Sequence, residues 1–112
     1  KLLKVALEHL RSNKILKLDV TDLRELQLPV YDGDIETEGL PSGVHKLGEK
    51  VHQADALIIA SPEYNASISS PLKNTVDWLS RLKPAVLEKK PVLLLAASPG
   101  GFGGIRALNH GR

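Results

Sequence analysis

The spacing of apolar residues predicts a chain in which helices and strands alternate. Leucines three to four residues apart near the start predict a first helix that ends near Ser12. The run from Ile15 to Val20 predicts a strand. The stretch from Thr21 to Gly43 is polar and rich in Pro, Gly and Asp, so we expect a long connection with one turn of helix.

The middle of the chain predicts a second helix and two buried strands. The helix presents one apolar face, formed by Val44, Leu47, Val51 and Ala54. The strands are the uninterrupted apolar runs at residues 56–60 and 92–97, which are rich in branched side chains. Runs of this kind are typical of strands that are covered on both faces of a parallel sheet.

A third helix is predicted between these strands, from Pro71 to about Lys83. Pro71 suits the first helical position, and the two serines before it can cap the helix. Its inner stripe would be formed by Leu72, Val76, Leu79 and Leu82. This alternation of helices and strands predicts a doubly wound parallel α/β sheet in a single domain over residues 1–112.

Composition narrows the class of protein. The 112 residues are 42% hydrophobic and 25% charged, which is typical of one small globular domain. The absence of cysteine excludes disulfides and thiol chemistry, and it fits a cytoplasmic location. Four aromatic residues and a net charge of +2 argue against nucleic acid as a partner, and no apolar run predicts a membrane span. Because the chain lacks methionine and starts within a helical pattern, we expect it to be part of something longer.

The polar residues form no constellation that predicts a catalytic side chain or a metal site. The histidines lack metal-ligand spacing, and no serine is paired with a clear base. The acidic residues between Asp32 and Glu38 are more typical of a solvated loop. We therefore expect neither a metal nor a catalytic side chain.

The most informative stretch is residues 61–81, which follows a predicted strand and leads into the third helix. Open α/β sheets hold their ligands in loops at the carboxyl ends of the strands. The stretch contains Pro-Glu-Tyr-Asn at residues 62–65, Leu-Lys-Asn at 72–74 and Asp-Trp-Leu-Ser-Arg at 77–81. This combination resembles the flavin-contacting loop of the NADPH-dependent FMN reductase family, the flavodoxin-like quinone, azo-dye and chromate reductases.

The resemblance assigns cofactor-binding residues to this loop. The backbone of Pro62, Glu63, Tyr64 and Asn65 would face the edge of the flavin ring near N5 and O4, without need of a particular side chain. The alternative is a capped strand-to-helix turn with Tyr64 packed on the surface. Trp78 is compatible with the core or with a subunit interface, and the resemblance favours the interface.

A glycine-rich loop after the second predicted strand supplies the other candidates, which are Ser98, Pro99, Gly100 and Gly101. The four glycines at residues 100–104 permit close backbone approach and positive φ, and their spacing fits neither a nucleoside-triphosphate loop nor a dinucleotide fingerprint. The family has a comparable loop against the pyrimidine side of the flavin. Amides at the start of the predicted helix after it would favour negative charge at N1 and O2. The alternative is a flexible turn.

The resemblance also implies a fold, a flavodoxin-like doubly wound parallel sheet of order 2-1-3-4-5. The three predicted strands would be the second, third and fourth, so the first and fifth would be missing from this chain, leaving the domain incomplete at both ends. The family's phosphate-binding loop, which follows its first strand, would also be missing, and Lys1 is not a substitute for it.

The implied function is that of an FMN-dependent NAD(P)H oxidoreductase, active as a homodimer or homotetramer. Hydride would pass from NAD(P)H to flavin N5 and on to a quinone, azo compound, metal ion or free flavin. One alternative is a flavin-binding redox sensor or electron carrier without NAD(P)H turnover. Another is an inactive fragment of the reductase.

Overall fold

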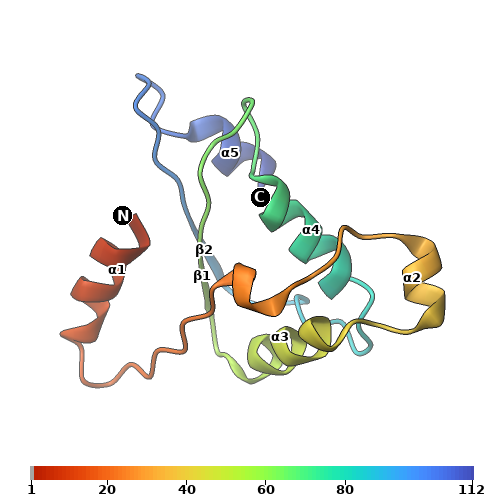
Figure 1. The fold of residues 1–112 in the computed structure, drawn as a ribbon. Coiled ribbons are helices and arrows are strands. Elements are labelled where there is room, and N and C mark those ends of the chain that lie inside the picture. The colour runs from red at the N-terminus through yellow and green to blue at the C-terminus, as the bar shows by residue number, and fades with distance from the viewer. Residues whose placement is uncertain (1) are drawn as a thin grey trace. The chain divides into compact units, whose positions relative to one another are not determined.

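The computed structural model describes residues 2–112, which contain five α-helices, one 3-10 helix and two strands. In chain order these are α1 (Leu2–Arg11), the 3-10 helix η1 (Leu23–Leu26), α2 (Gly33–Glu38), α3 (Ser42–Gln53), β1 (Leu57–Ala60), α4 (Ser70–Leu79), β2 (Val92–Leu95) and α5 (Ile105–His110) (Figure 1). None of the helices in this part of the chain is long and apolar enough to cross a bilayer.

The described residues divide into two compact units. The first unit comprises residues 2–20, 58–69 and 93–112, and the second comprises residues 21–57 and 70–92. The first unit contains α1, α5 and the loops that follow the two strands. The second contains η1 and helices α2, α3 and α4.

The two strands pair in parallel, as the sequence predicts. The amide of Leu57 donates to the carbonyl of Pro91, and the amide of Ser61 donates to the carbonyl of Leu95, both at 2.9 Å. Donors and acceptors therefore advance by four residues in the same direction on both strands, which only a parallel pair allows. The segments that follow β1 and β2 leave the pair at the same end (Figure 1).

The strands are less covered than their apolar sequences predict. Ile58 in β1 is 37% exposed and Leu93 in β2 is 54% exposed, so the expectation of burial on both faces is wrong for the described residues. A sheet of two strands is too narrow to be covered in that way, and within residues 2–112 β1 and β2 pair only with each other.

The strand predicted from Ile15 to Val20 is not formed. Ile15 lies in a turn after α1 and is 92% exposed, and the residues from Leu16 to Val20 have no regular secondary structure. An extended segment becomes a strand only when a neighbour accepts and donates its hydrogen bonds. No such neighbour is present among the described residues.

The connection from Thr21 to Gly43 contains more helix than predicted. Aspartates begin both short helices, because Asp22 Oδ1 accepts from the Arg24 amide at 3.0 Å and Asp32 Oδ1 accepts from the Asp34 amide at 2.8 Å. Hydrogen bonds from the Arg24 side chain also lower the pKa of Asp22 to about 2. Asp22 and Asp32 therefore cap the two short helices of this connection.

The second unit is built on the contact of α3 with α4 and η1. Its buried cluster comprises Leu47, Val51, Leu79 and Val86. The predicted apolar face of α3 is confirmed at Val44, Leu47 and Val51, whereas Ala54 follows the end of the helix and is half-buried. Close approach to η1 depends on Gly43, because a Cβ atom at that position would lie 2.2 Å from the carbonyl oxygen of Leu26.

Helix α4 is shorter than predicted, and of its predicted inner residues Leu72 and Leu79 are buried whereas Val76 is not. It ends at Leu79 rather than Lys83, and Val76 is 37% exposed. Thr75 and Trp78 are buried, and Trp78 has no exposed surface within this chain. The indole therefore belongs to the core, and the interface role favoured for it is wrong.

Gly43→Ala tests the contact between α3 and η1. We expect the substitution to lower the free energy of unfolding by about 2 kcal/mol, because the added methyl group would overlap a backbone oxygen that cannot move by itself. Gly33→Ala is the matched control, since a Cβ atom at Gly33 meets nothing within 4 Å. Urea denaturation of both variants measures the difference, and equal midpoints would contradict the close contact.

Candidate functional site

The candidate site consists of the two loops at the carboxyl ends of β1 and β2. Both loops belong to the first unit, residues 61–69 after β1 and residues 96–104 after β2. Because the strands are parallel neighbours, the loops start at the same edge of the sheet. Ligands of open α/β sheets bind at this edge.

The first loop closes on itself in a two-residue turn. The amides of Tyr64 and Ser67 donate to each other's carbonyls at 3.1 and 3.0 Å. The residues between them, Asn65 and Ala66, have φ values of 49° and 60°. Asparagine adopts positive φ readily, but alanine does so at a cost of about 1 kcal/mol. The turn therefore presents its residues from a defined and partly strained backbone.

A serine pair anchors the base of this loop. Ser61 Oγ accepts a hydrogen bond from the backbone amide of Ser69 at 3.2 Å and lies 3.1 Å from Ser69 Oγ. Ser69 is buried, whereas Tyr64 at the turn is 61% exposed. The loop thus has a fixed base and an exposed aromatic residue at its tip.

The second loop uses glycine where it enters α5. Positive φ occurs at Gly103 and Gly104, at 55° and 88°, and not at Gly100 or Gly101. A Cβ atom at Gly104 would also lie 2.8 Å from the Cβ of Ala96, so only glycine fits this position without displacement. Glycine has no side chain with which to cap the helix that follows.

Glu63 supplies the missing cap from the other loop. Its Oε2 atom accepts hydrogen bonds from the amides of Arg106 and Ala107, at 3.1 and 3.3 Å. These amides lie in the first turn of α5, where the helix end carries partial positive charge that a carboxylate stabilises. A side chain 43 residues away therefore caps α5.

A second contact joins the same loop to the other end of α5. Ser67 Oγ lies 3.0 Å from His110 Nδ1, within hydrogen-bonding distance. Glu63 and Ser67 flank the turn at Asn65 and Ala66, so both sides of the turn are held to one helix.

The structure places the eight predicted site residues on two loops but does not bring them into direct hydrogen-bonded contact. Within residues 2–112, no hydrogen bond joins residues 62–65 to residues 98–101. The link runs through the Glu63 side chain to α5. Except for Glu63 and Ser98, which are half-buried, the predicted residues are exposed. Lys1, rejected as a phosphate-site residue, lies outside the described residues.

The resemblance implies that the amides at the start of α5 would favour negative charge on a ligand. In the structure these amides are already paired within the chain. The amides of Arg106 and Ala107 donate to Glu63, and that of Ile105 donates to the Phe102 carbonyl at 3.0 Å. The negative charge that this helix end stabilises is therefore that of Glu63. Among the described residues, the amides of Gly101 and Phe102 have no hydrogen-bond partner and stay available to a ligand.

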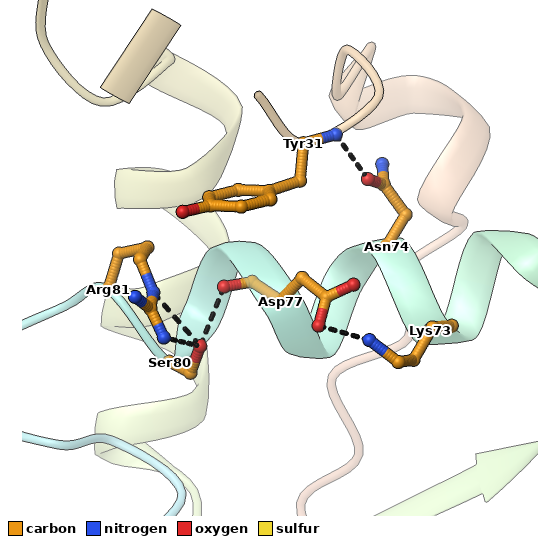
Figure 2. Close-up of polar contacts among 6 residues, drawn as sticks. All are labelled: Tyr31, Lys73, Asn74, Asp77, Ser80 and Arg81. Atoms are coloured by element: carbon orange, nitrogen blue, oxygen red, sulfur yellow. Dashed lines mark hydrogen bonds and ion pairs between the residues drawn. The ribbon is translucent and has the colours of Figure 1, made fainter. Parts of the chain in front are cut away.

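The second part of the motif, on α4, forms a clamp in the other unit. Asn74 Oδ1 accepts from the amide of Tyr31 at 2.7 Å (Figure 2). Asn74 Nδ2 donates to the carbonyl of Pro29 at 2.8 Å. Trp78 Nε1 donates to the same carbonyl at 2.8 Å. Both side chains thus hold the 29–31 segment against α4. Lys73 and Asp77, four residues apart on α4, also form an ion pair.

Tyr31 completes this clamp with its aromatic ring. The ring packs edge-on against Trp78 with centroids 5.0 Å apart, and the Arg81 guanidinium lies 5.8 Å from the Tyr31 centroid. The Tyr31 hydroxyl donates to Glu36 at 2.7 Å, and this hydrogen bond raises the pKa of Tyr31 above its usual value of 10.0. The motif residues on α4 are therefore architectural in the described chain.

Sequence reasoning identified neither the role of His110 nor the partner of the Glu63 carboxylate. For the Glu63 carboxylate, the sequence contains one indication that it has a distant partner. Gly103 and Gly104 precede the predicted helix where a capping Ser, Thr, Asp or Asn is usual, so an acceptor from elsewhere was required. Nothing local to Ser67 identifies His110 as its partner.

The chain belongs to the NADPH-dependent FMN reductase family, whose model matches residues 1–112. It is 46% identical over 84 residues to a quinone reductase of Escherichia coli (strain K12), covering 74% of this chain and 45% of that protein. It is 41% identical over 96 residues to an NADPH:quinone oxidoreductase of Arabidopsis thaliana, covering 85% of this chain and 47% of that protein.

A solved structure agrees with the family assignment. FerB, a flavoenzyme NAD(P)H:(acceptor) oxidoreductase from Paracoccus denitrificans, matches with a TM-score of 0.73 and 28% identity, covering 86% of this chain and 52% of that chain. The likeness to FerB and the parallel strand pair confirm an α/β fold of the flavodoxin-like kind. The chain spans about half the length of the curated relatives it matches.

Ala66→Gly tests the strain in the turn of the first loop. We expect it to raise the free energy of unfolding by about 1 kcal/mol, because glycine adopts the positive φ of this position without steric cost. Asn65→Gly is the control at the adjacent positive φ, and it should change stability little, since asparagine already tolerates this conformation. Thermal and urea unfolding measure both variants, and a destabilised Ala66→Gly protein would contradict the strain.

Asn74→Ala tests the clamp on α4. We expect a loss of about 2 kcal/mol in the free energy of unfolding, because the partly buried amide of Tyr31 would lose its acceptor. Lys73→Ala on the same helix is the control, and loss of its exposed ion pair should cost at most about 0.5 kcal/mol. Similar urea midpoints for the two variants would show that Asn74 does not act as a clamp.

Proposed function

We propose that this protein is an FMN-dependent NAD(P)H oxidoreductase whose second substrate is a small-molecule acceptor such as a quinone, azo compound, oxidised metal ion or free flavin. The observation that carries this proposal is the pair of loops at the carboxyl edge of β1 and β2, joined by Glu63. Membership of the FMN reductase family and the activities for which the relatives are named support it.

The donors of the two loops fit a flat heteroaromatic ring with polar edges. The amides of Gly101 and Phe102 have no partner within residues 2–112, and the site glycines leave the backbone accessible. We assign the ring to the backbone of residues 62–65 and 98–101, as the motif resemblance implies. No residue of the described chain is assigned to the phosphate.

The residues of this chain would bind and orient, and the cofactor would carry the redox chemistry. Bound FMN would accept hydride from NAD(P)H and pass electrons to the acceptor. Tyr64, exposed at the tip of the first loop, would offer an aromatic surface beside the ring. No catalytic acid or base is proposed, since the hydride transfer needs none.

The larger architecture is part of the same proposal. We assign β1 and β2 to the third and fourth strands of a sheet of order 2-1-3-4-5, and residues 1–112 to one flavodoxin-like domain. Among the described residues the first and fifth strands have no counterpart, and the second, predicted at residues 15–20, is not formed. This agrees with the coverage of about half of FerB. We further propose a homodimer or homotetramer and a cytoplasmic location, on family resemblance.

Flavin retention tests the proposed function. The purified protein, incubated with FMN and passed through a gel-filtration column, should retain the blue absorption band of the flavin, and NADPH added without oxygen should bleach it. A quinone added afterwards should restore the band. A retained band that NADPH does not bleach would contradict the reductase and indicate an electron carrier or sensor. A colourless protein would contradict flavin binding altogether.

A matched pair of variants locates the binding surface. Gly100→Val should weaken FMN binding about tenfold, because the side chain would cover backbone that a flat ligand must approach. A Cβ atom at Gly100 makes only an ordinary contact, 3.8 Å from Ser98 Oγ, so the fold should tolerate it. Gly33→Val, in α2 and with open space around its Cβ, should leave FMN affinity unchanged.

A further inference from the structure

The two ties between the first loop and α5 have a shared geometry. Glu63 holds the first turn of α5 through the amides of Arg106 and Ala107, and Ser67 contacts His110 in its last turn. The two tethering residues on the loop are four apart in sequence, and so are Arg106 and His110 on the helix. A short loop segment therefore runs along one helix and is fastened at both ends.

Between these two contacts, few interactions stabilise the conformation of the loop. The turn at Asn65 and Ala66 is closed by two backbone hydrogen bonds and carries positive φ at both residues. Tyr64 is largely exposed and contributes little packing. A short exposed turn of this kind loses order readily when its contacts are removed.

We propose that Glu63 is a positioning residue that fixes the loop at residues 61–69 onto α5, so that both loops of the site are ordered before the flavin binds. The inference rests on the proposed function for the identity of the ligand, but the contact itself does not. Ordering a loop in advance removes an entropic cost from binding, so the contribution of Glu63 should appear as affinity. Its carboxylate would act through the backbone and not by touching the ligand.

The competing interpretation is that Glu63 only stabilises α5. Loss of a helix cap lowers stability wherever the helix lies, whereas loss of a positioning contact also weakens binding. The second unit offers a matched cap at Asp32, whose carboxylate accepts from the Asp34 amide at 2.8 Å. Asp32→Ala therefore removes a comparable cap in the unit that does not contain the candidate loops.

The test compares Glu63→Ala, Glu63→Gln and Asp32→Ala in the purified protein. Hydrogen exchange without ligand reports on the contact, and titration with FMN reports on affinity. In Glu63→Ala the amides of Arg106, Ala107, Tyr64 and Ser67 should exchange about tenfold faster, and FMN should bind about tenfold more weakly. Glu63→Gln keeps an acceptor oxygen, so it should restore most of the protection and affinity.

Each outcome decides the proposal. Unchanged exchange at Arg106 and Ala107 in Glu63→Ala would overturn the contact. Faster exchange with unchanged FMN affinity, or an equal loss of affinity in Asp32→Ala, would overturn positioning and leave only a cap. If the unmodified protein binds no FMN, the proposed function fails, and the exchange measurement alone still decides whether Glu63 orders the loop.

Discussion

Parallel pairing of β1 with β2 is the constraint on which the candidate site depends. The hydrogen bonds from Leu57 to Pro91 and from Ser61 to Leu95 lie at the two ends of this pair. Because both strands point the same way, the loops that follow them start from one edge. This brings Glu63 within reach of Arg106 although 43 residues separate them. An antiparallel pair would have sent the loops to opposite ends and left α5 without its cap.

The first loop contains a strained turn and the second leads into a helix without a cap of its own. Contacts between the first loop and α5 stabilise both. The first loop places Ala66 at positive φ, which a short turn sustains only when surrounding contacts hold it. The second loop enters α5 through Gly104, which packs closely against Ala96 but cannot cap the helix. The Glu63 carboxylate satisfies the uncapped amides and fastens one side of the strained turn. One side chain therefore stabilises both segments.

The sequence predicts those elements whose signals are local. The spacing of Val44, Leu47 and Val51 identified α3 and its buried face, and uninterrupted apolar runs identified both strands. The run from Ile15 to Val20 looked equally strand-like, but its state depends on a neighbouring strand, which the run itself does not encode. Trp78 is similar, because its indole packs against Tyr31 and donates to the carbonyl of Pro29, 49 residues away, and the local sequence encodes neither contact.

The candidate site likewise has one part that the sequence predicts and another that depends on distant contacts. Motif spacing located both loops, but the partner of Glu63 depends on strand pairing and so could not be read from the motif. That partner decides which backbone donors are left for a ligand. With the amides of Arg106 and Ala107 paired to Glu63, the proposed ligand at the second loop would meet the amides of Gly101 and Phe102 instead. Polarisation of the proposed ligand would therefore come from loop peptides, since the carboxylate already offsets the positive end of α5.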